Sequence, residues 1–108
     1  MNEYEKELLN DKNKLCFLHN LLSTRHFSEE FLELTIGYYD SWRCLRTQND
    51  LSPYFCFRYL YDNDTDSADD WTDYYDVLRY LKKRDIYTVD FIQQEFERAM
   101  KDREIKNN

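Results

Sequence analysis

The segment Phe27-Ser28-Glu29-Glu30-Phe31-Leu32 recurs 60 residues later as Tyr87-Thr88-Val89-Asp90-Phe91-Ile92, and this recurrence points to the fold. In both copies an aromatic residue precedes a hydroxyl residue that can cap a helix. The aromatic can pack on the aliphatic residue four positions past the cap, as in a hydrophobic staple. The two copies predict two similar helical hairpins, and therefore an all-α, compact bundle of four to five helices.

Apolar residues at helical spacing predict long helices on both sides of the first cap. One covers residues 3–22 and has a polar middle at 10–14 where it can bend. The next begins at Ser28 and runs through the lone Gly37. We expect its buried stripe to be Phe31, Leu34, Tyr38, Trp42 and Leu45.

The segment Asn49-Asp50-Leu51-Ser52-Pro53 marks a stop and a restart, with Ser52 as a cap and Pro53 in the first helical position. Residues 54–61 follow as a short helix or a buried strand, because periodicity does not separate the two over eight residues. Ser67 and Asp70 resemble a capping box that starts a helix over 68–84, which ends at Lys82-Lys83-Arg84. Its expected stripe is Trp71, Tyr74, Tyr75, Leu78 and Leu81.

Thr88 is expected to cap the last helix, and residues 103–108 to fray. Phe91 is expected to be the more exposed of the two repeated phenylalanines, whereas Trp42 and Trp71 belong to the core. The inner stripe of this helix would be Val89, Ile92, Phe96 and Met100.

Composition restricts the class of protein. The chain has 108 residues, enough for one domain over residues 1–108. One Gly and one Pro are too few for the turns of an all-β fold. No apolar run is long enough for a membrane span, and the acidic N-terminus is unlike a signal peptide, so we expect a cytoplasmic protein. The three cysteines, Cys16, Cys44 and Cys56, are expected to be reduced and buried.

The net charge of −7 is concentrated in an acidic window, residues 62–76, which contains no Lys or Arg. The window holds seven of the 22 acidic residues, so the remaining 15 equal the 15 Lys and Arg. A local field of this kind steers a cationic partner and repels nucleic acid and anionic membrane. The predicted partner-binding residues are its aspartates and two flanking tyrosines: Asp62, Asp64, Asp66, Asp69, Asp70, Asp73, Asp76, Tyr61 and Tyr80.

Metal chemistry has weaker support. Asp62, Asp64, Asp66 and Asp73 match the ligand spacing of an EF-hand loop, but Ser67 stands where that loop needs glycine. Cys16 and His19 lie one turn apart, without a second pair of ligands for zinc. We therefore predict no metal and no cofactor.

Catalysis also has weak support. The sequence contains no Gly-rich phosphate loop, no G-x-S-x-G and no H-E-x-x-H. Arg43 and Arg46 are the nearest cations that could serve an acidic catalytic site, and nothing in the sequence connects them to it. We expect a protein that is not an enzyme.

In size, charge and Tyr/Asp content the chain is similar to small acidic inhibitors, such as immunity proteins of nuclease toxins and anti-defence proteins of phages. This similarity of type assigns no residue a role. It implies an inhibitor or nucleic-acid mimic that docks on a basic surface of a nucleic-acid-handling enzyme. The alternatives are a structural or adaptor subunit with an aromatic helical interface, and a calcium-dependent switch. The oligomeric state is not predicted.

Overall fold

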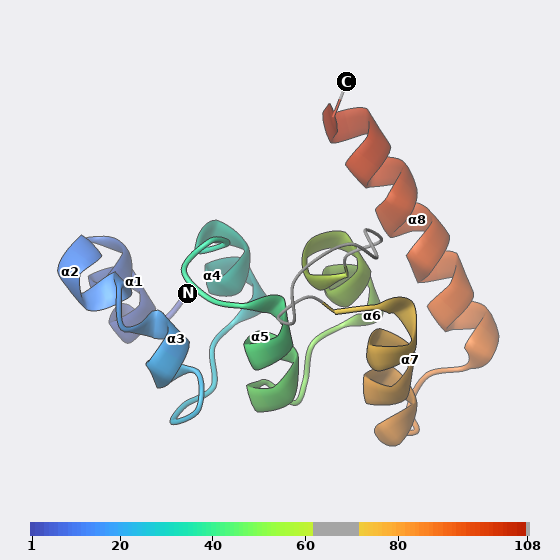
Figure 1. Cartoon of the computed structure of the whole chain (residues 1–108), viewed down its shortest axis with the longest axis horizontal. Coiled ribbons are helices and arrows are strands. Elements are labelled where there is room, and N and C mark those ends of the chain that lie inside the picture. Colours follow the sequence, from blue (N-terminus) through green and yellow to red (C-terminus); the bar gives the residue numbers. More distant parts are fainter. Residues whose placement is uncertain (62–71, 108) are drawn as a thin grey trace.

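The computed structural model describes residues 1–61 and 72–107, and these residues form an all-α protein (Figure 1). Residues 54–61, ambiguous from sequence, are helical except for the last. The helices are α1 (Glu3–Leu9), α2 (Lys12–Leu15), α3 (Leu18–Leu21), α4 (Glu29–Leu34), α5 (Ser41–Thr47), α6 (Pro53–Phe55), the π-helical turn η1 (Cys56–Leu60), α7 (Tyr74–Lys83) and α8 (Val89–Asn107).

The helices form successive hairpins. Figure 1 shows α3, α5 and α7 along one edge of the molecule and α4 and α6 above them. The first hairpin contains α1 and α3, the second α4 and α5, and the third α6, η1 and α7. Helix α8 then crosses the end of the array and packs on α6 and η1. The predicted all-α fold is confirmed for the described residues. The two hairpins that the repeat predicted would turn at Ser28 and at Thr88, whereas in the structure Ser28 lies between the first and second hairpins and Thr88 lies between the third hairpin and α8.

Serine caps join each hairpin to the one before it. Ser28 caps α4 by accepting a hydrogen bond from the Phe31 N–H at 3.2 Å, and Ser52 caps α6 in the same way through Phe55. The backbone N–H of Ser28 donates to Glu5 Oε2 at 2.7 Å. The caps at Ser28, Ser52 and Thr88 were predicted correctly, because capping depends on residues close in sequence.

A second set of bonds joins the hairpins through the residue before each cap. The N–H of Phe27 donates to Gln48 Oε1 at 2.8 Å, and the N–H of Leu51 donates to the hydroxyl of Tyr80 at 3.1 Å. Gln48 lies at the end of α5 and Tyr80 on α7. In both cases the donor lies in the segment between two hairpins, and the acceptor belongs to the second of the two. Consecutive hairpins are therefore held in the same register by side chains that satisfy buried backbone donors.

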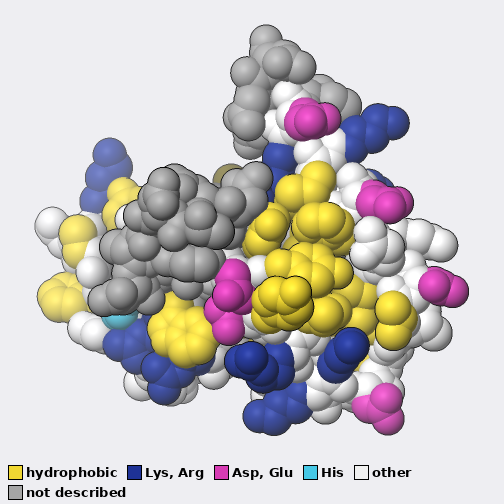
Figure 2. Space-filling view, turned by 45° about the vertical axis from the view of Figure 1, so that its right-hand side comes forward, with side chains coloured by type: hydrophobic (Ala, Val, Ile, Leu, Met, Phe, Trp, Pro, Cys, Tyr) yellow, Lys and Arg dark blue, Asp and Glu magenta, His cyan; other side chains and the backbone are white. Residues whose placement is uncertain are grey.

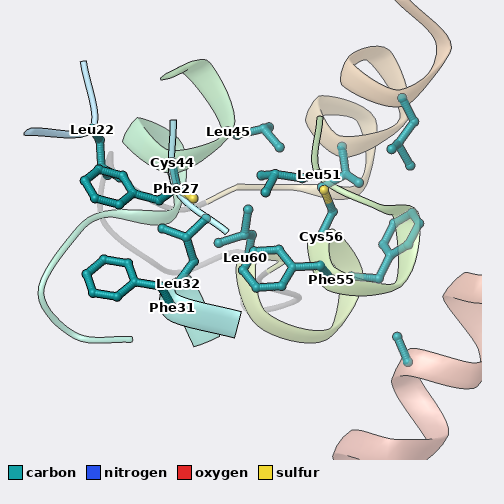
Figure 3. Close-up of a cluster of buried hydrophobic side chains, with 14 of the residues drawn as sticks. Leu22, Phe27, Phe31, Leu32, Cys44, Leu45, Leu51, Phe55, Cys56 and Leu60 are labelled. Atoms are coloured by element: carbon teal, nitrogen blue, oxygen red, sulfur yellow. The ribbon is translucent and has the colours of Figure 1, made fainter. Parts of the chain in front are cut away.

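The core runs along the hairpins and combines leucine with phenylalanine (Figure 3). Phe27 and Phe31 are fully buried and stack with ring centroids 5.1 Å apart. Tyr87 and Phe91 stack in the same way at 5.6 Å, but Phe91 is 40% exposed. In each copy of the repeat, the aromatic before the cap thus stacks on the phenylalanine at the third helical position. The prediction that Phe91 is the more exposed copy is confirmed.

The two long helices predicted in the first half of the chain were wrong. The segment 3–22 forms three short helices, because Asp11 caps a new helix at Lys12 and the chain turns again at Cys16 and Phe17. The helix from Ser28 ends at Leu34, since Gly37 adopts a φ of 103°, outside the helical region. The predicted stripe residues Leu34, Tyr38 and Trp42 are exposed, so Trp42 is not a core residue.

Two further boundaries and two stripe residues differ in the second half. Helix α7 begins at Tyr74, with Asp73 as its cap, instead of at residue 68. Tyr75 and Val89, predicted as stripe residues, are 70% and 66% exposed. Helix α8 continues through Asn107 instead of fraying from 103. Ser67, Asp70 and Trp71 lie outside the described residues.

Candidate functional site

A groove of about 590 Å³ lies between α5 and α7, the neighbouring lower helices of the second and third hairpins. Residues one helical turn apart line it on both helices, and two of them, Asp76 and Tyr80, are predicted partner-binding residues. The lining from the first wall is Trp42, Leu45, Arg46, Gln48 and Asn49, and from the second wall Asp76, Arg79, Tyr80, Lys83 and Arg84.

The amphipathic pattern of α7 explains which residues face the groove. Val77 and Leu81 are buried on the core side. Residues 76, 79, 80, 83 and 84 lie on a neighbouring face, at the spacing of three and four that brings side chains together on a helix. On α7 the groove is therefore lined from a different face than the one that carries Val77 and Leu81.

The groove carries an excess of positive charge. Among the described residues that line it, four cations, Arg46, Arg79, Lys83 and Arg84, accompany one carboxylate, that of Asp76. Arg79 lies 3.5 Å from Asp76 and partly neutralises it. Arg84 donates to the carbonyl oxygen of Leu51 and covers the ring of Tyr80, with its guanidinium 5.1 Å from the ring centroid. Arg84 thus supports the wall, whereas Arg46 and Lys83 are exposed.

Tyr80 is a structural part of the groove wall on α7. Its hydroxyl donates to the carbonyl oxygen of Gln48 at 2.5 Å and accepts from the N–H of Leu51. Burial raises the pKa of Tyr80 above its ordinary value. The hydroxyl therefore stays protonated at neutral pH, and its hydrogen bonds are already used within the chain.

Of the nine predicted partner-binding residues, the structure describes four. Tyr61 is half-buried in an aromatic cluster with Phe57, Tyr74 and Phe96, with ring centroids between 4.9 and 6.5 Å apart. Asp73 and Asp76 form a capping box at the start of α7, in which Asp73 Oδ1 accepts from the Asp76 N–H at 2.8 Å. The remaining predicted residues, Asp62, Asp64, Asp66, Asp69 and Asp70, lie outside the described residues.

The two residues that flank the segment 62–71 are held in place by contacts with the rest of the protein. Tyr61 and Thr72 form a bridge between the two ends of the segment 62–71. Arg103 of α8 donates to the carbonyl oxygens of Tyr61 at 2.8 Å and Phe57 at 3.1 Å. The two residues that flank the segment 62–71 therefore lie side by side.

The cysteines and histidines do not form a reaction centre within residues 1–61 and 72–107. Burial raises the pKa of the Cys44 thiol to about 12, and it also raises the pKa of Cys56, so both thiols are protonated at neutral pH. Cys16 is exposed, contrary to the prediction that all three thiols are buried. His26 pairs with Asp50 at 2.5 Å on the surface. Over the same residues no three metal-ligating side chains lie together.

Sequence reasoning missed most of the groove. Trp42 was assigned to the core, and Arg46 was noted without a connection to the acids, although the groove brings it to the same site as Asp76. The sequence contained two signals of a shared helix face, the pairs Trp42/Arg46 and Arg79/Lys83 at a spacing of four. These pairs did not reveal that the two helices are neighbours.

Comparison of the chain with protein-family models, with curated proteins and with solved structures yields no match. Among the described residues, no helix has both the length and the apolar character that crossing a membrane requires. The functional assignment therefore depends on the geometry and charge of the chain itself.

Proposed function

We propose that this protein is a non-catalytic inhibitor that docks on a basic surface of a nucleic-acid-handling enzyme through its acidic window, residues 62–76. The relevant residues are those predicted from the sequence, Asp62, Asp64, Asp66, Asp69, Asp70, Asp73, Asp76, Tyr61 and Tyr80. Its biological setting would be that of an immunity or anti-defence protein.

One observation supports this proposal: six of the seven aspartates of the acidic window lie in the connection between η1 and α7, which is longer than the corresponding connection of the second hairpin. The two helices of the second hairpin are joined by residues 35–40, whereas residues 61–73 join η1 to α7 in the third. The bonds described above that fix the register of the hairpins are made by Phe27, Ser28, Leu51 and Ser52. In arrays of helical units, a longer connection of this kind commonly belongs to the binding face.

The acids of the window fall into two groups. Asp73 and Asp76 stabilise the start of α7, so their presence has a structural explanation. The five aspartates at 62, 64, 66, 69 and 70 lie outside the described residues, and like charges at this density in a sequence oppose folding. Steering of a cationic surface gives them a role, and it would act mainly on the rate of association.

The test distinguishes an effect of the position of the carboxylates from an effect of the net charge of the protein. One variant changes Asp62, Asp64, Asp66, Asp69 and Asp70 to Asn. The matched control removes five exposed acids elsewhere by changing Glu3 and Glu7 to Gln, Asp85 and Asp90 to Asn, and Glu97 to Gln. Both variants have the same net charge, and both leave the capping box intact.

Partners are first identified by cross-linking and mass spectrometry, and the purified partner is then measured by surface plasmon resonance at several salt concentrations. We expect the window variant to associate at least tenfold more slowly at low salt, and the difference to shrink as salt screens the charges. We expect the control to associate within about twofold of the native protein. Equal loss in both variants would show that only the total charge matters, which contradicts the proposal.

A second candidate, an adaptor with an aromatic helical interface, has one observation in its favour. Around the start of α7 and the start of α8, the apolar side chains of Tyr75, Ile86, Val89 and Phe91 are between 40% and 70% exposed. An adaptor of this kind would bind through these residues with little dependence on salt. The salt series of the same experiment therefore distinguishes the two candidates.

A further inference from the structure

We propose that the groove between α5 and α7 binds a small phosphorylated ligand with a planar ring, of the nucleotide class. The groove shares Asp76 and Tyr80 with the docking residues proposed above, but its cations are not among them, and the inference does not depend on the function proposed above. Figure 2 shows Lys and Arg side chains gathered along the lower edge of the molecule, with hydrophobic side chains above them.

The charges of the groove favour a compact anion. Arg46 comes from one wall, and Arg79 and Lys83 from the other, so an anion inside the groove meets cations on both sides. Guanidinium and ammonium groups are the usual protein ligands of phosphate. Asp76 opposes an anion only weakly, because it lies 3.5 Å from Arg79 and also accepts a hydrogen bond from the Asp73 N–H at 3.3 Å.

The aromatic lining favours a planar group on the same ligand. Trp42 is 38% exposed at the groove although its indole is large and apolar. A base can stack on an exposed aromatic side chain, because every base has a π-face. Arg46, one turn after Trp42, lies with its guanidinium 5.7 Å from the Trp42 ring centroid. A ring on Trp42 would therefore place its attached phosphates close to Arg46.

The volume of the groove favours a small ligand over an extended one. Its volume of about 590 Å³ falls within the range of about 300–1,000 Å³ that is typical of sites for small molecules and cofactors. An acidic peptide would match the charge but would leave the exposed Trp42 ring without a planar partner. We therefore take a nucleotide as the ligand and an acidic peptide as the competing outcome.

The experiment uses ATP as the probe and the full chain with Trp71→Phe, which leaves Trp42 as the only tryptophan. Quenching of its fluorescence and isothermal titration calorimetry measure binding at low salt. We expect a dissociation constant in the micromolar range. We also expect inorganic pyrophosphate to compete with ATP, and adenosine without phosphates to bind at least tenfold more weakly than ATP.

Three variants test the residues, with one matched control. Arg46→Ala and Lys83→Ala remove exposed cations that the framework does not use, and each should weaken ATP binding about tenfold. Trp42→Ala should weaken it by a similar factor, measured by calorimetry. Lys101→Ala removes an exposed cation on α8, away from the residues that line the groove, and should leave the affinity within about twofold.

Four results would overturn the proposal: no binding of ATP at millimolar concentration, unchanged affinity in the three groove variants, equal loss in the Lys101 control, or binding of hexaglutamate in preference to ATP. Circular dichroism of each variant excludes unfolding as the cause of a loss. Because the assay contains no protein partner, its outcome is independent of the docking experiment with the window variant.

Discussion

Glu29 accepts two hydrogen bonds from Ser52, one from the backbone N–H at 2.5 Å and one from the hydroxyl at 3.1 Å. Glu5 accepts the same two bonds from Ser28. In each case a carboxylate of one hairpin lies at the N-terminus of the first helix of the next, where negative charge is favourable. Helices as short as those of this chain are marginal by themselves, so these junctions help to hold them in place.

We expect Glu29→Ala to lower the free energy of unfolding by about 1–3 kcal/mol, because the N–H of Ser52 loses its acceptor. Glu30→Ala, next to it and exposed, should change the free energy of unfolding by less than about 0.5 kcal/mol. Urea denaturation of both variants measures the difference. Equal effects would mean that the junction contributes no specific stability.

The two copies of the repeated phenylalanine differ in burial, which gives a paired test of packing. Phe31→Ala should cost about 3–5 kcal/mol, since its ring is fully buried. Phe91→Ala should cost about 1 kcal/mol, mainly the stacking on Tyr87, because its ring is already 40% exposed. Thermal denaturation followed by circular dichroism measures both. A loss at Phe91 as large as that at Phe31 would show that the exposed copy is buried in solution.

The features that the sequence predicted correctly are local. Ser28, Ser52 and Thr88 each cap a helix through a bond to a residue three positions later, so the signal lies within four residues. Helix length was less predictable. Gly37 can sit within a helix or end one, and the apolar spacing around it was compatible with both.

The groove could not be predicted because it depends on which helices become neighbours. Arg46 and Asp76 are 30 residues apart and meet only because α5 and α7 are corresponding helices of consecutive hairpins. Trp42 is exposed, and it lies beyond the break at Gly37. Long-range packing therefore determined the site, whereas short-range signals determined the elements.

The capping box at Asp73 predicts a difference between two similar substitutions. Asp73→Asn should retain nearly all of the stability, because asparagine caps helices as well as aspartate does. Asp73→Ala should cost about 0.5–2 kcal/mol, since the Asp76 N–H loses its acceptor. Urea denaturation of both variants provides the measurement. A stable alanine variant would indicate that α7 begins elsewhere in solution.

The three thiols should react at different rates. Cys16 is exposed, whereas Cys44 and Cys56 are fully buried, with thiols whose pKa is raised by burial. Only the thiolate is nucleophilic, so we expect one thiol to react rapidly with Ellman's reagent at pH 8 and two to react only on unfolding. Cys16→Ser should abolish the rapid phase. Rapid reaction of a second thiol in this variant would contradict the burial of Cys44 and Cys56.

The same buried groups predict that the protein loses stability in alkali. Burial raises the pKa of Cys44 from 9.0 to about 12, and it also raises the pKa of Tyr39 and of Tyr80 above 10.0. Above about pH 9 the unfolded chain releases these protons while the folded chain retains them, so the unfolded state binds fewer protons and becomes more favourable. We expect the urea midpoint to be level between about pH 7 and pH 8.5 and to fall steadily toward about pH 10.5.

Tyr80→Phe removes one titrating group together with its hydrogen bonds, so this variant should start less stable and lose stability less steeply with pH. A midpoint that stays level through about pH 10.5 would show that these side chains ionise as easily in the folded protein as in the unfolded chain.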